Sequence, residues 1–127
     1  MSYNILGVNL NHVQDKRLEK TKRLQEQYGG VIVLKGYESI ILEADDLEAD
    51  DNVIICPHGN PGMAVGGMGD VLAGMISGFV AQKISLNNAA ILGVFLHAQS
   101  ADLAVKDYGE LSLLPTDLFK YFVKILY

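Results

Sequence analysis

The pattern of apolar and polar positions in the first half of the chain predicts one helix and three strands. Residues 12–28 carry apolar side chains at roughly helical spacing among charged ones, and a pair of glycines follows, so we expect a surface helix that ends there. The segment 31–42 holds two short β-branched runs around Gly36, which predicts a hairpin or a strand pair with a tight connection. Residues 53–56 predict a buried strand. The stretch 57–69 is too rich in glycine and proline to form the interior of an element.

The pattern becomes helical after the glycine-rich stretch. Residues 70–83 are apolar on most faces, with small residues four apart, which favours a helix buried inside a domain. Gly74 and Gly78 have the spacing of membrane helix dimers, and in a soluble helix this spacing indicates close packing.

Two further helices complete the predicted order. Ser85 is a suitable N-cap for a long helix at roughly 86–107, which a Tyr-Gly pair ends. A Pro-Thr-Asp sequence at 115–117 opens a short last helix. The order of helix, three strands, glycine-rich loop and three helices predicts an α/β fold, although it supplies few strands for a self-contained sheet.

Composition narrows the class of protein. The chain has 127 residues, 50% of them hydrophobic, and a net charge of −5, which is typical of one folded domain rather than a disordered chain. We interpret the single cysteine, Cys56, as a small buried hydrophobe in a reducing compartment. Because no signal peptide or bilayer-length apolar run is found, we expect a cytoplasmic protein without a membrane partner, and we expect no nucleic-acid partner. The acids are concentrated in 43–51, which predicts an exposed loop and does not exclude an anionic ligand.

The glycine-rich stretch is the strongest candidate for chemistry. Seven of the 13 glycines lie within twenty residues, and Gly66-Gly67-Met68-Gly69-Asp70 leads directly into a helical pattern. Such a turn leaves several backbone N–H groups unpaired at the positive end of a helix, an arrangement that binds phosphate. Asp70 could cap the helix or act as a base beside the anion. In the alternative reading, the glycines only permit close helix packing and Asp70 is only an N-cap.

Two common glycine motifs are excluded. A P-loop requires a Gly-Lys pair, and the chain has none. A dinucleotide fingerprint requires a third glycine where this chain has Leu72. The glycine turn therefore predicts an anion site without specifying its class.

A lysine and three histidines are the other candidates. Lys35 ends an apolar strand, so its ammonium could reach a cleft at the strand end, or it could simply extend into solvent. We expect His58 to be exposed in the loop, His97 to lie in a helix core and His12 to lie on the surface. No pair of these has metal-ligand spacing, so we predict no metal bound by protein ligands alone.

Three segments together resemble one family. The run Asn60-Pro61-Gly62-Met63-Ala64-Val65-Gly66-Gly67-Met68-Gly69-Asp70 resembles the signature of the ADP-dependent NAD(P)H-hydrate dehydratases, the C-terminal domain of the YjeF-type repair proteins. The segments 28–36 and 113–118 are similar to the family's strand ending in Lys-Gly and to its Leu-x-Thr-Asp-Leu sequence. The resemblance runs from about Asn4 to the end of the chain.

The resemblance implies both a fold and a reaction. The fold is the ribokinase-like, three-layer α/β fold, of which residues 1–127 would form the C-terminal half of a carbohydrate-kinase-type domain, with few strands plus helices. The enzyme is a hydro-lyase that repairs hydrated NAD(P)H: a phosphoryl group of ADP (or ATP) passes to the ring hydroxyl, and loss of phosphate restores NAD(P)H and leaves AMP. Mg²⁺ would accompany the phosphates.

The resemblance also assigns roles to residues of this chain. Asp70 would be catalytic and would contact the hydrated nicotinamide, and we expect Asn60 to bind substrate as well. The residues expected to bind the nucleotide are Lys35, Gly36, Tyr37, Glu38, Ser39, Gly66, Gly67, Met68 and Gly69. The family usually has Ser or Thr where this chain has Val65, so one hydroxyl is missing.

Two alternatives to the repair reaction stay open. A glycine anion site followed by Asp also serves sugar and vitamin kinases of the ribokinase-like fold. The chain could also be an inactive nucleotide-binding fragment. An incomplete sheet exposes unpaired edge groups, so we expect a homo-oligomer or pairing with the missing half of the domain.

Overall fold

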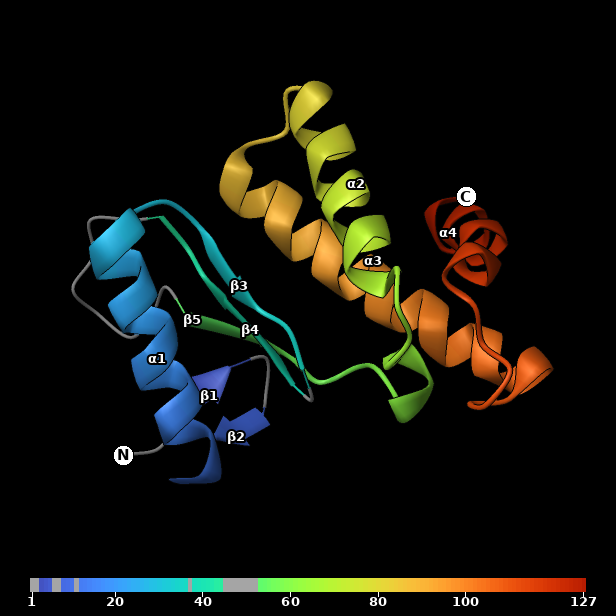
Figure 1. Ribbon diagram of the computed structural model, residues 1–127. Helices are drawn as coiled ribbons and strands as arrows, with labels where there is room; N and C mark the ends of the chain where they lie inside the picture. Colours follow the sequence, from blue (N-terminus) through green and yellow to red (C-terminus); the bar gives the residue numbers. More distant parts are fainter. Residues whose placement is uncertain (1–2, 6–7, 11, 37, 45–52) are drawn as a thin grey trace. The chain divides into compact units, whose positions relative to one another are not determined.

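The computed structural model describes residues 3–5, 8–10, 12–36, 38–44 and 53–127. The chain forms two compact units, the first ending at Pro57 and the second beginning at His58. Each unit is described by itself below, and Figure 1 labels their helices and strands.

The first unit contains one helix and two small sheets. Strands β1 and β2 form an antiparallel pair, and a second antiparallel sheet has the order β3-β4-β5. The bounds are β1 (Tyr3–Ile5), β2 (Val8–Leu10), α1 (His12–Tyr28), β3 (Ile32–Leu34), β4 (Ser39–Leu42) and β5 (Val53–Cys56). The predicted helix, strand pair and buried strand are therefore confirmed. The pair β1–β2 was not predicted, because each strand has only three residues and each contains a polar Asn that weakens the apolar pattern.

A small core joins α1 to the larger sheet. Leu18 of α1 is buried together with Ile40 and Leu42 of β4 and Val53 and Ile55 of β5. Figure 1 shows α1 running along this sheet, and α1 contacts both β3 and β4. Residues two apart on β4 and on β5 point to the same face of the sheet, which explains why these pairs share one core. Cys56 is buried, as the sequence predicted. Most of the acidic segment 43–51 lies outside the described residues.

The second unit is helical. Its elements are η2 (Pro61–Met63), α2 (Met68–Ala81), α3 (Leu86–Tyr108), η3 (Pro115–Leu118) and α4 (Phe119–Leu126). The Ser85 hydroxyl accepts a hydrogen bond from the Asn88 N–H at 3.3 Å, so the predicted N-cap is confirmed. Helix α3 ends at Gly109, whose φ of 76° suits a glycine. In the described part of the chain, neither α3 nor any other helix has both the length and the apolar character needed to cross a membrane.

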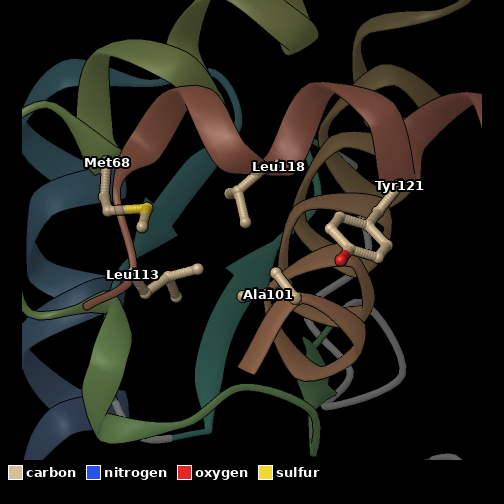
Figure 2. Close-up of a cluster of buried hydrophobic side chains, with 6 residues drawn as sticks. Met68, Ala101, Leu113, Leu118 and Tyr121 are labelled. Carbon is tan, nitrogen blue, oxygen red and sulfur yellow. The ribbon is translucent and has the colours of Figure 1, made fainter. Parts of the chain in front are cut away.

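Helix α3 is the centre of the second unit, because α2, η3 and α4 all pack against it. Figure 2 shows the resulting core, in which Met68 from the start of α2 lies among buried side chains of the later elements. The other buried members are Ala101, Ala104, Leu113, Leu118 and Tyr121. The two alanines leave room on α3 for the larger side chains opposite. The Tyr121 hydroxyl donates a hydrogen bond to the Asp107 carboxylate, which raises the pKa of Tyr121.

The structure corrects the prediction for residues 70–83. Only Met68 and Leu72 of α2 are buried, so α2 is not a helix enclosed on all sides in the described chain. Gly74 and Gly78 are exposed, and a Cβ at either would meet nothing within 4 Å, so the predicted close packing at these glycines is wrong. Within its unit α2 packs mainly on α3. Gly74 and Gly78, four residues apart, lie together on the exposed face of α2. The close approach is instead at Gly93 of α3, where a Cβ would lie 2.5 Å from Cγ1 of Ile76.

This geometry predicts opposite effects for two glycine substitutions. Gly93→Ala forces α2 and α3 apart and should lower the free energy of unfolding by about 1–3 kcal/mol, the usual cost of overpacking. Gly74→Ala adds a methyl group in open space on a helix and should raise it by about 0.4–1 kcal/mol. Urea unfolding followed by circular dichroism measures both. Equal stability of the two variants would contradict the described α2–α3 contact.

Candidate functional site

The glycine turn lies directly before α2. Gly67 is the N-cap residue of α2, with a left-handed φ of 97° and no side-chain capping bond. The backbone N–H groups of Gly66, Gly67, Gly69 and Asp70 donate to no acceptor within the described residues. Both glycines of the turn are exposed. The structure thus has the arrangement that the sequence predicted, a helix start with unbonded N–H donors.

Asp70 lies in the first turn of α2 and is exposed. Because the N-cap is Gly67, the alternative in which Asp70 is only an N-cap is wrong. An exposed carboxylate one turn from unbonded N–H groups can accept a proton or a hydrogen bond from a molecule bound at the turn. Met68, between the glycines and Asp70, is different: its side chain is buried in the core, and its N–H donates to the Val65 carbonyl at 3.3 Å.

The segment before α4 supports the glycine turn. A Cβ at Gly67 would lie 3.2 Å from Cγ of Pro115, so the proline ring packs closely over the turn. Leu113 and Leu118, on either side of Pro115, are buried in the same core as Met68. The Leu114 N–H donates to the Asp117 carboxylate at 2.8 Å, which fixes the start of η3. The Leu-Pro-Thr-Asp-Leu segment is therefore a structural support for the turn.

The loop that leads into the turn is held by a carboxylate of α3. Asp102 accepts hydrogen bonds from the Gly59 N–H at 3.1 Å and from the Asn60 side-chain amide at 2.9 Å. The Asn60 side-chain oxygen accepts in turn from the Gly62 N–H at 2.9 Å and caps η2. Asn60 therefore already binds protein groups through both ends of its amide.

A hollow of about 280 Å³ adjoins this loop. It is lined by His58, Gln99, Asp102, Leu103, Lys106 and Ile125. His58 is exposed, as predicted, and its ring nitrogen lies 3.4 Å from the Gln99 amide nitrogen. His97 is buried in α3, also as predicted.

The predicted nucleotide segment lies in the first unit, at the turn between β3 and β4. Lys35 and Gly36 are exposed, whereas Glu38 and Ser39 are half-buried, and Tyr37 lies outside the described residues. The Ser39 hydroxyl lies within hydrogen-bond distance of both the N–H and the carbonyl of Gly36. The Ser39 hydroxyl therefore closes the turn, and the exposed Lys35 lies at the start of the turn.

Arg17 of α1 holds the same turn through its backbone carbonyls. Its guanidinium donates to the carbonyls of Glu38 at 3.2 Å and of Leu34 and Lys35 at 3.5 Å. A Cβ at Gly36 would lie 2.9 Å from Nη2 of Arg17, and the φ of 149° at Gly36 is one that other residues rarely adopt. Sequence reasoning missed Arg17, because nothing distinguishes it from the other charged residues of 12–28.

Asp102 was also missed, although the sequence contains a signal. It is the sole Asp, Glu, Lys or Arg between Lys83 and Lys106. A single charge inside a long apolar helical pattern requires partners when the helix packs. The candidate residues thus form two groups: the Lys35–Ser39 turn in the first unit, and Asn60 with the glycine turn and Asp70 in the second.

The comparison with protein families decides between the classes of anion site. The model of the NAD(P)H-hydrate dehydratase family matches residues 3–124. The chain belongs to this family. A bifunctional NAD(P)H-hydrate repair enzyme of Coxiella burnetii is 50% identical over 92% of the chain, and an ADP-dependent (S)-NAD(P)H-hydrate dehydratase of Bacillus subtilis is 34% identical over 91%. The chain spans 23% of the length of the first and 40% of the second.

Solved structures of the dehydratase family and its fold agree with this assignment. The ADP/ATP-dependent NAD(P)H-hydrate dehydratase of B. subtilis, co-crystallised with ATP and Mg²⁺, superimposes with a TM-score of 0.77 at 32% identity. The match covers 95% of this chain and 42% of that one. A ribokinase-like protein of Enterococcus faecalis gives a TM-score of 0.68 at 36% identity, over 86% of this chain and 36% of that one. The α/β, ribokinase-like assignment is therefore confirmed, and the chain corresponds to less than half of these structures.

The turn geometry predicts that its two glycines are not equivalent. Gly67→Ala places a side chain at a left-handed φ and against Pro115, and should destabilise the protein by about 1–3 kcal/mol. Gly66→Ala adds a methyl group where nothing lies within 4 Å and should change stability by less than about 0.5 kcal/mol. Thermal unfolding of both variants provides the measurement. A Gly67→Ala protein as stable as Gly66→Ala would contradict the conformation of the turn.

Proposed function

We propose that the chain takes part in the ADP-dependent dehydration of hydrated NAD(P)H. The observation that supports this most directly is the turn at Gly66 and Gly67, which has unbonded N–H donors and leads within one helical turn to the exposed carboxylate of Asp70. This turn lies in a chain of the NAD(P)H-hydrate dehydratase family.

The glycine turn would bind the phosphoryl group that is transferred. Hydroxide is a poor leaving group, and phosphorylation of the ring hydroxyl makes its departure feasible. The hydroxyl oxygen attacks the β-phosphorus of ADP, the bond from phosphorus to the AMP oxygen breaks, and AMP leaves. Loss of phosphate and of a ring proton then restores the reduced nicotinamide. The N–H donors and the positive end of α2 would stabilise the negative charge on the phosphoryl oxygens.

Asp70 would act on the attacking hydroxyl. The carboxylate can accept the hydroxyl proton as the bond to phosphorus forms, as an aspartate does in other phosphoryl transfers. Its exposure in the first turn of α2 leaves it accessible to a substrate at the glycine turn. Asn60 retains one N–H on its amide beyond the bond to Asp102, and we propose that this group contacts the substrate.

The turn that carries Lys35 would bind the AMP part of the nucleotide. The exposed ammonium of Lys35 can pair with a phosphate oxygen, and the backbone at Gly36 and Glu38 is held by the Ser39 hydroxyl and by Arg17. By the resemblance, a Ser or Thr hydroxyl of the family is missing at Val65, which would weaken phosphate binding by about 0.5–1.5 kcal/mol where that hydroxyl bonds a phosphate.

Magnesium fits this site as an ion carried by the nucleotide. Within the described residues, no group of three or more His, Cys, Asp and Glu could hold a metal ion. Asp70 offers one hard oxygen ligand near the turn, so phosphate oxygens and water would supply most ligands. The ion would neutralise charge on the phosphates when bound.

The partner and the compartment are also proposals. The exposed apolar side chains of α2 and α4 include Val80, Phe119, Val123 and Leu126, and the solved relatives have more than twice the matched length. We propose that the chain pairs with a polypeptide equivalent to the rest of that domain, or with a second copy of itself, and that it works in the cytoplasm. A sugar or vitamin kinase activity is not favoured, because the family model and the named relatives are dehydratases.

The assigned roles predict that Asp70→Asn and Lys35→Ala separate turnover from binding. Asp70→Asn should reduce the recovery of nicotinamide absorbance from hydrated NADH and ADP by about 100-fold or more, because it removes the base. Measured without Mg²⁺, its dissociation constant for ADP should stay within about threefold of the wild type, since without the ion a neutral amide beside phosphate removes repulsion rather than a contact. Calorimetry and absorbance provide the two measurements.

Lys35→Ala should weaken ADP binding about tenfold or more, because a charge-assisted hydrogen bond is lost. Lys20→Ala, an exposed lysine of α1, is the matched control and should bind ADP as the wild type does. Equal loss of binding in the Asp70 and Lys35 variants, or a wild-type protein that neither binds ADP nor restores NADH, would contradict the proposal.

A further inference from the structure

The loop between β5 and the glycine turn is fixed by a set of three hydrogen bonds that begins at Asp102. One carboxylate oxygen of Asp102 accepts from the Gly59 N–H, and the other accepts from the Asn60 amide. The Asn60 oxygen then accepts from the Gly62 N–H. We call these bonds the Asp102 clamp. All of its members belong to the second unit, so the clamp is complete within one compact part of the chain.

The clamp needs these residue types at these positions. Gly59 and Asn60 each present a donor to residue 102, and a carboxylate has two oxygens to accept them, whereas an amide has one. Position 60 must donate to residue 102 and accept from Gly62 at the same time, which an asparagine amide does. Asp102 lies on α3, about forty residues away along the chain, so it ties the loop to the most extensively packed helix of the unit.

The clamp fixes the backbone at Gly59 and Asn60, where the loop that leads to the glycine turn begins. Asn60 is the N-cap of η2, and η2 is followed by Ala64, Val65 and the two glycines. A loop with so many glycines has large conformational freedom, which it would otherwise lose only on binding a ligand. A loop held in advance binds more tightly, because less entropy is lost at binding.

We propose that Asp102 is a positioning residue for the phosphate turn: it fixes Gly59 and Asn60, and through them the shape in which the N–H groups at Gly66 and Gly67 meet a phosphate. Asp102 does not itself touch the phosphate in this account. The inference rests on the proposed function in that it takes a nucleotide phosphate to be the ligand of the turn.

Exchange of the two residue types tests the clamp. In Asp102→Asn, one of the two donors loses its acceptor. In Asn60→Asp, two carboxylates face each other and the donor to Asp102 is lost. The double variant N60D/D102N restores all three bonds with the same net charge: Asp at 60 accepts from Gly62 and from the new amide at 102, whose oxygen accepts from Gly59.

Two measurements compare the wild type with the single and double variants, at a temperature at which every variant is folded. Amide hydrogen exchange reports on the loop, with the N–H of Gly62 and the N–H of Met68, which bridges the turn to Val65, as the reporters. Calorimetry with ADP and Mg²⁺ reports on the phosphate turn. Each single variant should exchange these amides at least about tenfold faster and bind ADP about tenfold more weakly, and the double variant should return both values to within about threefold of the wild type.

The outcomes separate this inference from the proposed function. If the double variant is no better than the worse single variant, or if the single variants leave both readings unchanged, the clamp does not position the turn. Faster exchange without weaker ADP binding also overturns the inference, because the loop would then be irrelevant to the phosphate. If the wild type binds no ADP, the proposed function fails, and the inference, which needs a phosphate ligand, fails with it while the exchange data still describe the loop.

Discussion

The glycine turn must satisfy two opposed requirements, and the rest of the second unit is arranged around them. Its N–H groups have to stay unbonded, since donors engaged with the protein could not bind a phosphate. The bond from the Met68 N–H to the Val65 carbonyl crosses the turn, but with the glycine N–H groups unbonded it gives the turn little reason to keep one shape. The structure supplies that shape from outside: Met68 is anchored in the core, Pro115 packs over Gly67, and the Asp102 clamp holds the loop before it. Each support comes from α3 or from the segment that packs on α3.

The turn between β3 and β4 follows the same principle in the first unit. The carbonyls of Lys35 and Glu38 accept hydrogen bonds from the guanidinium of Arg17, and the Ser39 hydroxyl donates to the Gly36 carbonyl. Lys35 is left exposed beside this fixed backbone. In both units, then, a short exposed segment with candidate ligand groups is held by side chains from elements distant in the sequence. Preorganisation of this kind is what phosphoryl transfer requires, because its catalysis is mainly positioning and electrostatic stabilisation.

Local signals allowed much of the fold to be predicted. The cap at Ser85, the glycine after α3 and the β-branched runs of the sheet act through nearby residues, so the sequence pattern contains them. The glycine turn was also predictable, because a glycine run before a helical pattern has few structural explanations. The exposure of Gly74 and Gly78 was not predictable from the sequence. The pattern of α2 shows which of its faces are apolar, but it does not show how many of those faces are covered by neighbouring elements. Arg17 and Asp102 act across 17 to 43 residues of sequence, a range at which no local pattern identifies the partner.

Family membership and the site geometry together favour a repair reaction with phosphoryl transfer, and the fate of the phosphate tests this most directly. Phosphorus NMR of the protein with hydrated NADH, ADP and Mg²⁺ follows every phosphate in one sample. The account predicts that ADP disappears while AMP and inorganic phosphate appear in equal amounts, one of each per NADH restored. Stable phosphorylated substrate without inorganic phosphate, or NADH restored without consumption of ADP, would contradict it.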